Sequence, residues 1–146
     1  QPLRIAVHPG GKPYLEDSPR AIAFNLSHAK DLGLLAVGCD CDLGVDVEQP
    51  RHIDDPLRLA QRALSATEVS HLRSLPDDQR NACFLDLWTR MESRQKAVGS
   101  GILAEAVDPQ SLSSLSFQPS PGQFACVSVR PPRPDLGLRF FDYHAV

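Results

Sequence analysis

The chain has 146 residues, the size of one domain, and its 15 lysines and arginines stand against 18 aspartates and glutamates. The net charge of −3 gives no general attraction to nucleic acid or to an anionic membrane, so neither is expected as a partner. No apolar run approaches the roughly 18 residues of a membrane-spanning helix, and the four cysteines lack the spacing of a secreted disulfide framework. These features predict a soluble cytoplasmic protein with reduced thiols.

The first third of the sequence predicts strands. Short apolar runs separated by proline, glycine or aspartate are typical of strands joined by turns. The runs cover residues 3–7, 21–26, 34–37 and 43–48. An Asp-rich turn at residues 39–42 predicts that the last two runs form a hairpin.

The middle of the sequence predicts three helices. Residues 56–64 have the helical period and begin with proline after an aspartate N-cap. Ser65 and Glu68 fit a capping box, which predicts a short helix to about Leu75. A longer helix follows and ends at Gly99-Ser100-Gly101.

Three further apolar runs follow the long helix, separated by proline and glycine. They are residues 115–117, 124–129 and 138–141. Their spacing predicts a terminal antiparallel meander. The expected fold class is therefore α+β, with a small, mostly antiparallel sheet packed against a long helix and shorter helices.

Two of these elements carry charged groups that can meet in space. In a strand over residues 43–48, the period of two points Asp46 and Glu48 to the same side. In the long helix, Glu92 and Lys96 lie one turn apart on one face. Hard cations such as Mg²⁺ take oxygen ligands and bind one or two carboxylates together with substrate phosphates. The three carboxylates therefore suit a metal that bridges protein to phosphate, with the lysine neutralising charge on that phosphate.

Simpler interpretations of the same residues stay open. The acidic pair of the strand suits the polar face of an edge strand, and Glu92 with Lys96 suits a surface ion pair worth about 0.3–0.5 kcal/mol. Helix capping explains Glu68 fully. A metal-dependent nuclease also uses such carboxylates, although the chain lacks a basic stripe for a nucleic-acid backbone.

Five blocks of sequence also occur together in a fixed order. They are Gly11-Lys12-Pro13, Phe24-Asn25-Leu26-Ser27-His28, Gly44-Val45-Asp46-Val47-Glu48, Leu64-Ser65-Ala66-Thr67-Glu68 and Trp88 to Lys96. In order and spacing the set resembles the 4′-phosphopantetheinyl transferases of the larger, surfactin-synthetase-activating type. Such enzymes transfer the phosphopantetheine arm of coenzyme A to a serine of an acyl or peptidyl carrier protein.

The resemblance implies roles for single residues. Asp46, Glu48 and Glu92 would face the Mg²⁺ that holds the pyrophosphate of coenzyme A. Glu92 would also activate the serine hydroxyl, and Lys96 would contact the phosphate and stabilise the leaving group. Lys12, Ser27 and His28 would fall on the coenzyme A side of the site. For Ser27 and His28, a strand end capped by a side-chain hydrogen bond is the alternative interpretation.

The chain departs from the family pattern in the long helix. Met91 stands where the family usually has lysine, and Ser93-Arg94 replaces a common alanine-aromatic pair. Loss of an ammonium weakens electrostatic stabilisation of a pyrophosphate unless Arg90 or Arg94 compensates. The alternative function is therefore a degenerate homologue that binds coenzyme A or a carrier protein without turnover.

The chain also departs in length. The larger transferases comprise two similar halves with coenzyme A between them, and this chain resembles mainly the C-terminal half. We expect residues 1–146 to form a single domain of this kind. Either the domain is a fragment that lacks an N-terminal half, or a homo-oligomer supplies the missing wall from a neighbour.

Overall fold

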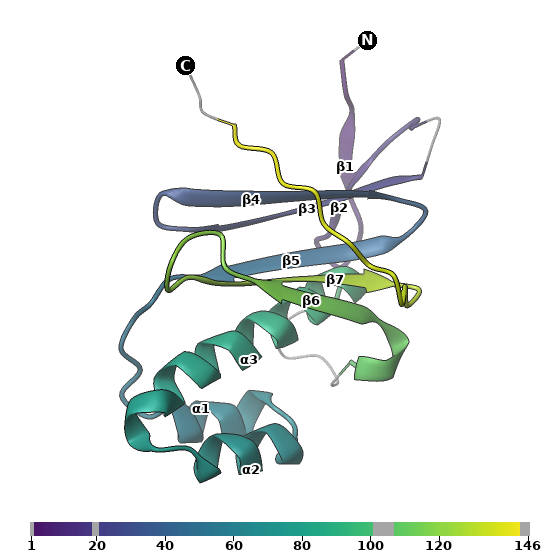
Figure 1. Ribbon diagram of the computed structural model, residues 1–146. Coiled ribbons are helices and arrows are strands. Elements are labelled where there is room, and N and C mark those ends of the chain that lie inside the picture. Colours follow the sequence, from purple (N-terminus) through teal and green to yellow (C-terminus); the bar gives the residue numbers. More distant parts are fainter. Residues whose placement is uncertain (1, 19–20, 101–106, 144–146) are drawn as a thin grey trace.

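Small antiparallel sheets lie on one side of the structure and the helices on the other (Figure 1). The computed structural model describes residues 2–18, 21–100 and 107–143. Within these ranges the strands are β1 (Ile5–Val7), β2 (Pro13–Leu15), β3 (Ile22–Ala29), β4 (Leu32–Cys39), β5 (Asp42–Glu48), β6 (Ser113–Phe117) and β7 (Phe124–Arg130). The helices are α1 (Pro56–Ala63), α2 (Ala66–Ser74) and α3 (Asp77–Val98), with a 3₁₀ turn at Pro109–Ser111. The predicted α+β class is confirmed.

The strands pair in three antiparallel sheets, and one pairing differs from the prediction. β1 pairs with β2, β3 pairs with β4, and the third sheet has the order β5–β7–β6. The predicted hairpin between residues 34–37 and 43–48 is therefore wrong, because β4 turns back on β3 and β5 takes β7 as its ladder partner. In the turn between them, Asp40 has a φ of 53°, a left-handed conformation that redirects the chain from one sheet to the next.

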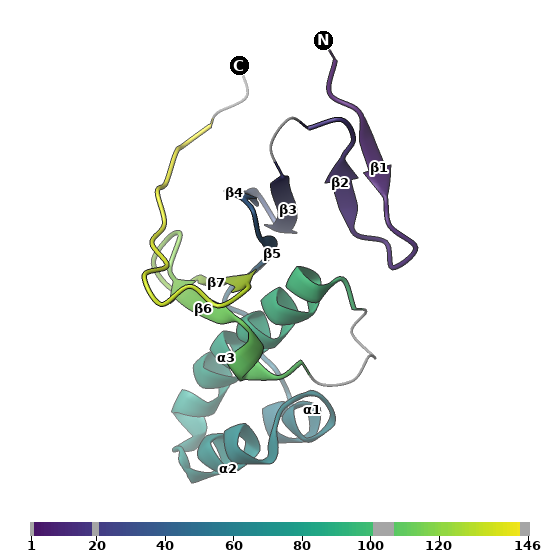
Figure 2. The same cartoon turned by 90° about the vertical axis from the view of Figure 1, so that its right-hand side faces the viewer.

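The C-terminal meander is shorter than the sequence predicts. β6 and β7 pair antiparallel, as expected of the runs at residues 115–117 and 124–129. Residues 138–141, predicted as a third strand, have no regular secondary structure. Leu138 packs against the sheet core, whereas Phe141 is 87% exposed, so this segment crosses the sheets as an irregular strap (yellow in Figures 1 and 2).

The helix ends follow the signals in the sequence. Asp55 caps α1 by accepting a hydrogen bond from a first-turn backbone N–H. Ser65 and Glu68 form both bonds of the predicted capping box at the start of α2. Gly99 closes α3 with a φ of 73°, a left-handed conformation that favours glycine. The last residue of the predicted glycine stop, Gly101, lies outside the described ranges.

Two hydrophobic clusters lie on opposite sides of α3. One lies among the helices and consists of Ile53, Ala60, Leu72, Phe84 and Leu85. The other lies within the sheets and consists of Leu43, Val45, Val127 and Val129. Figure 2 shows α3 between the sheet layer and the two shorter helices. No helix of the described ranges is long and apolar enough to cross a membrane.

Candidate functional site

The close approach of β5 to α3 builds the site, and it depends on Gly44. A Cβ atom added to Gly44 would lie 2.2 Å from the backbone oxygen of Ser93 and 2.4 Å from the backbone nitrogen of Ala97. Because only glycine fits there, the strand packs directly on the helix backbone. Asp46 and Glu48 follow Gly44 by two and four residues and therefore lie on the same face of β5, next to α3.

Asp46 and Lys96 make a partly buried ion pair at the centre of this contact. The Lys96 ammonium donates to Asp46 Oδ1 at 2.7 Å, to Ser27 Oγ at 3.2 Å and to the Val45 backbone oxygen at 3.2 Å. The Ser27 hydroxyl donates to the same Asp46 oxygen at 3.0 Å. Asp46 is only 6% exposed, and its Oδ2 is buried with no hydrogen-bond partner in the described part of the chain. One carboxylate oxygen is thus engaged, whereas the other is buried without a hydrogen-bond partner among the described residues.

Glu92 lies next to this pair and is 7% exposed. Burial raises the pKa of Glu92 above its ordinary value, and the negative charge of Asp46 raises it further. The Lys96 ammonium opposes this shift, and Glu48 adds a smaller repulsion. Asp46, Lys96 and Glu48 therefore all lie close enough to Glu92 to act on it electrostatically, and their predicted convergence on one cation stays a prediction.

Glu48 has a different partner from the other two carboxylates. Its Oε2 lies 3.3 Å from Nε of Arg51, and its Oε1 accepts from a terminal nitrogen of Arg51 at 3.5 Å. In the described ranges no three His, Cys, Asp or Glu side chains are grouped closely enough to hold a metal ion. The donor chemistry nevertheless fits a hard cation, because Asp46 has an unpartnered oxygen and Glu92, a second carboxylate, lies close enough to interact with it.

An open pocket of about 490 Å³ lies over the ion pair. Its lining includes most of the site residues predicted from the sequence, namely Ser27, His28, Asp46, Glu48 and Lys96. Lys30 and Arg51 add two more positive side chains to the lining. The lining thus combines the carboxylates of Asp46 and Glu48 with three basic side chains, and the basic side chains suit an anionic ligand such as a phosphate ester.

Lys12 lies elsewhere. Its ammonium donates to the backbone oxygen of Ala97, near the C-terminal end of α3, and burial lowers its pKa. It lines a second pocket of about 390 Å³, together with Tyr14 and Arg130. The structure thus brings Ser27 and Lys96 into contact but leaves Lys12 in a separate pocket, and its role in binding coenzyme A stays a prediction.

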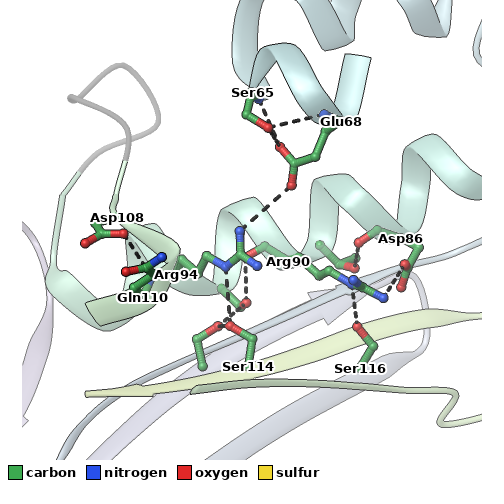
Figure 3. Close-up of polar contacts among 12 residues, drawn as sticks. Ser65, Glu68, Asp86, Arg90, Arg94, Asp108, Gln110, Ser114 and Ser116 are labelled. Atoms are coloured by element: carbon green, nitrogen blue, oxygen red, sulfur yellow. Dashed lines mark hydrogen bonds and ion pairs between the residues drawn. The ribbon is translucent and has the colours of Figure 1, made fainter. Parts of the chain in front are cut away.

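The two arginines expected to compensate for Met91 do not lie in the site. Arg90 pairs with Asp86 of its own helix at 2.8 Å and donates to Ser116 in β6, and Arg94 is held by other partners on the same side of α3 (Figure 3). Two residues along a helix correspond to about 200° of rotation, so both arginines face away from Glu92. In this arrangement neither arginine stands in for the missing lysine, and the effect of Met91 on activity stays a prediction.

Two side chains of the site were not identified from the sequence. Asn25, 7% exposed, accepts from the backbone N–H of Val45 at 2.9 Å and so joins β3 to β5. Its place between Phe24 and Leu26 in a family motif was the available signal. Arg51 pairs with Glu48, and its only signal was a spacing of three residues.

Comparisons with known proteins place these motifs in a family. The model of the 4′-phosphopantetheinyl transferase superfamily matches residues 42–144. The 4′-phosphopantetheinyl transferase HetI of Nostoc is 42% identical over 94 residues, which are 63% of this chain and 40% of that protein. A putative 4′-phosphopantetheinyl transferase of Synechocystis is 32% identical over 126 residues, 84% of this chain and 51% of that protein.

A third relative extends the comparison beyond cyanobacteria. The 4′-phosphopantetheinyl transferase Sfp of Bacillus subtilis is 33% identical over 100 residues, 68% of this chain and 43% of that protein. The chain thus spans about half the length of these relatives. With the match to the family model, the chain belongs to the 4′-phosphopantetheinyl transferase superfamily.

Proposed function

We propose that the protein transfers the 4′-phosphopantetheine arm of coenzyme A to a serine of an acyl or peptidyl carrier protein, in a Mg²⁺-dependent reaction. The observation that carries this proposal is the cluster of Asp46, Lys96 and Glu92 beside an open pocket with a basic lining. Its support is that the relatives from Nostoc and Bacillus subtilis bear the name of this transferase.

Lys96 is suited to stabilise a phosphate that leaves. Phosphoryl transfer depends mainly on alignment and on electrostatic stabilisation of the transferring group. The ammonium of Lys96 is fixed by Asp46 Oδ1 and the backbone oxygen of Val45, yet the side chain remains 30% exposed. It therefore meets an anion in the pocket in an orientation that is already set.

Glu92 is suited to accept the proton of the carrier serine. A serine hydroxyl is a weak nucleophile at neutral pH and needs a base of matched pKa. Burial and the charge of Asp46 raise the pKa of Glu92 toward that range. Asp46, Glu48 and Glu92 would hold the Mg²⁺, which when bound neutralises charge on the pyrophosphate.

Ser27, His28 and Lys12 are proposed to bind coenzyme A. Ser27 and His28 line the pocket above the ion pair, where the pyrophosphate would lie. Lys12 lines the second pocket and would contact coenzyme A only if the nucleotide extends toward the C-terminal end of α3. A fall in coenzyme A affinity for His28→Ala with no change for Lys12→Ala would limit binding to the first pocket.

The proposal includes a partner surface that packs on the β3–β4 hairpin and encloses the pocket. The outer face of the β3–β4 hairpin exposes Leu26, Leu35 and Val37 by 59%, 64% and 63%. An apolar face of this kind is typical of an interface. Its occupant would be either an N-terminal half like that of the longer relatives or a second copy of this chain. Light scattering of the purified chain distinguishes them, since a homo-oligomer supports the second copy and a monomer supports the missing half.

The state of the cysteines bears on the cellular compartment of the protein. Cys39, Cys41, Cys83 and Cys126 are all free, as the sequence predicted. Free cysteines are typical of proteins in a reducing compartment. We propose the cytoplasm, a reducing compartment, as the place of the reaction.

The test is incubation of the chain with coenzyme A, Mg²⁺ and an apo carrier protein, followed by mass spectrometry of the carrier. The expected result is a mass gain equal to the phosphopantetheine arm, lost with Lys96→Met and with chelation of the metal. No mass gain with the wild-type chain, under any divalent metal, would contradict the proposal.

Binding without turnover is the second candidate. The observation that favours it is Met91 in place of the family lysine, together with Arg90 and Arg94 turned away from the site. Calorimetry distinguishes the two functions. Tight binding of coenzyme A or carrier without transfer supports the second candidate, and absence of both binding and transfer refutes it.

A further inference from the structure

Arg94 connects three elements of the fold on the side of α3 opposite Glu92 and Lys96. One of its terminal nitrogens lies 3.9 Å from Oε1 of Glu68 in α2, and its Nε donates to Oγ of Ser114 in β6 at 3.3 Å. The side chain is only 18% exposed. Figure 3 shows the guanidinium between the start of α2 and the strand. Arg94 thus joins both neighbours of α3 on this side.

Its partner on α2 is itself fixed. The other oxygen of Glu68, Oε2, accepts from the backbone N–H of Ser65 at 2.9 Å and from the Ser65 hydroxyl at 2.7 Å. The first of these bonds is half of the capping box, and both leave Oε1 facing Arg94 (Figure 3). A capping glutamate held in this way gives Arg94 an anchor that cannot follow a rotation of α3.

Its partner on β6 belongs to a chain of hydroxyl groups that returns to α3. The Oγ atoms of Ser114 and Ser128 are 2.8 Å apart, and those of Ser128 and Ser93 are also 2.8 Å apart. Ser93 then donates to the backbone oxygen of Arg90 at 2.9 Å. Ser93 and Ser128 are fully buried, so water does not compete for these bonds. Ser93 and Arg94, two neighbouring positions of the helix, are therefore both attached to the β6–β7 pair, in addition to the bond from Arg90 to Ser116.

The orientation of α3 about its own axis decides where Glu92 and Lys96 point. Arg94 lies two residues from each of them, which is about 200° around the helix. A rotation of about 10° would move a group about 6 Å from the helix axis by about 1 Å. A misplacement of that size can lower a rate by about a hundredfold. Whatever fixes the Arg94 side of the helix also fixes the Asp46 side.

We propose that Arg94 is a positioning residue: its contacts with Glu68 and Ser114 set the rotation of α3 and so hold Lys96 and Glu92 against Asp46. The expected effect of Arg94 on turnover rests on the proposed function. The contact between Lys96 and Asp46, which Arg94 is proposed to maintain, can be measured without turnover.

The experiment compares Arg94→Met with Arg90→Met. Arg90 is the matched control, because it lies one turn away on the same side of α3 and contacts its own helix and β6 but not α2. Two readouts are taken below the unfolding temperature of every variant. One is kcat and KM for coenzyme A, and the other is the rate of acylation of Lys96 by an amine-reactive reagent, relative to the exposed Lys30, from peptide mass spectrometry.

For Arg94→Met we expect kcat to fall about tenfold with KM changed less than twofold, and the relative acylation rate of Lys96 to rise at least threefold. Arg90→Met should change neither quantity by more than twofold. Arg94→Lys should recover part of kcat, since an ammonium still pairs with Glu68. If Arg94→Met does not fold, Glu68→Gln replaces it, with the same changes expected at smaller size.

The experiment distinguishes a failure of the positioning role from a failure of the proposed function. If Arg94→Met equals Arg90→Met in both readouts, the positioning role is wrong although transfer by the wild-type chain still stands. If the wild-type chain does not transfer the arm, the proposed function fails, and the acylation rate of Lys96 alone decides whether Arg94 positions the helix.

Discussion

Both sides of α3 carry charged side chains, but the two sides differ in how completely these groups are paired. Toward α2 and β6, the polar atoms of Arg90 and Arg94 find acids and serine hydroxyls. Toward β5, Asp46 keeps a buried oxygen without a partner and the pKa of Glu92 is raised. A satisfied network stabilises and positions, whereas unsatisfied buried charge costs stability and persists where a ligand completes it. The contrast favours the β5 side for the proposed chemistry.

Gly44→Ala should have the largest effect, because it breaks the contact on which the β5 side is built. Its Cβ would meet backbone atoms of Ser93 and Ala97, which cannot move as a flexible side chain would. We expect a loss of at least about 3 kcal/mol in the free energy of unfolding, measured by urea denaturation. Gly33→Ala is the control, since a Cβ there meets nothing within 4 Å. Equal stability of the two variants would show that α3 does not rest on β5.

Lys96→Met should come next and removes the ammonium while keeping the stem of the side chain. Asp46 is then left buried without its main partner, so we expect a loss of about 1–3 kcal/mol in unfolding free energy and of about a hundredfold or more in transfer. Adding Asp46→Asn should restore stability but not transfer. Arg62→Met, an exposed charge on α1, is the control. Full transfer by Lys96→Met would assign the phosphate contact to another cation.

The sequence predicted the helix side of the site better than the sheet side. The spacing of Glu92 and Lys96 places both on one helix face, and the structure agrees. Lys96, however, pairs with Asp46 across the fold, not with Glu92 one turn away, because Gly44 lets β5 approach the helix backbone. No local pattern reports such an approach.

The errors have the same physical origin. Two apolar runs joined by an Asp-rich turn predict a hairpin, but this local pattern does not show whether another strand pairs with either run instead. Here β5 pairs with β7, which lies more than 75 residues later in the sequence. Glu68 was explained fully by capping, and capping is confirmed, yet its second oxygen also holds Arg94. Local rules predict elements and caps, while partners distant in sequence decide the remaining contacts.

Glu92→Gln should have a smaller effect on stability, opposite in sign. Because the pKa of Glu92 is raised in the folded state, the folded protein binds more protons than the unfolded chain between the two pKa values. The carboxylate therefore lowers stability progressively as the pH rises through that window. We expect Glu92→Gln to match the wild type near pH 4 and to exceed it in unfolding free energy at pH 8, while transfer is lost. Urea titrations at both pH values test this, and a variant less stable at pH 8 would contradict it.

Arg90→Met should have the smallest effect and tests the satisfied side of α3. The Arg90 side chain is 40% exposed, and its ion pair with Asp86 is an i, i+4 pair of the kind worth about 0.3–0.5 kcal/mol. With the bond to Ser116 added, the loss should stay within about 1 kcal/mol in urea denaturation, and transfer should be unchanged. A large fall in transfer would mean that the contacts of Arg90 also position α3, and Arg90 would then not be a control for Arg94.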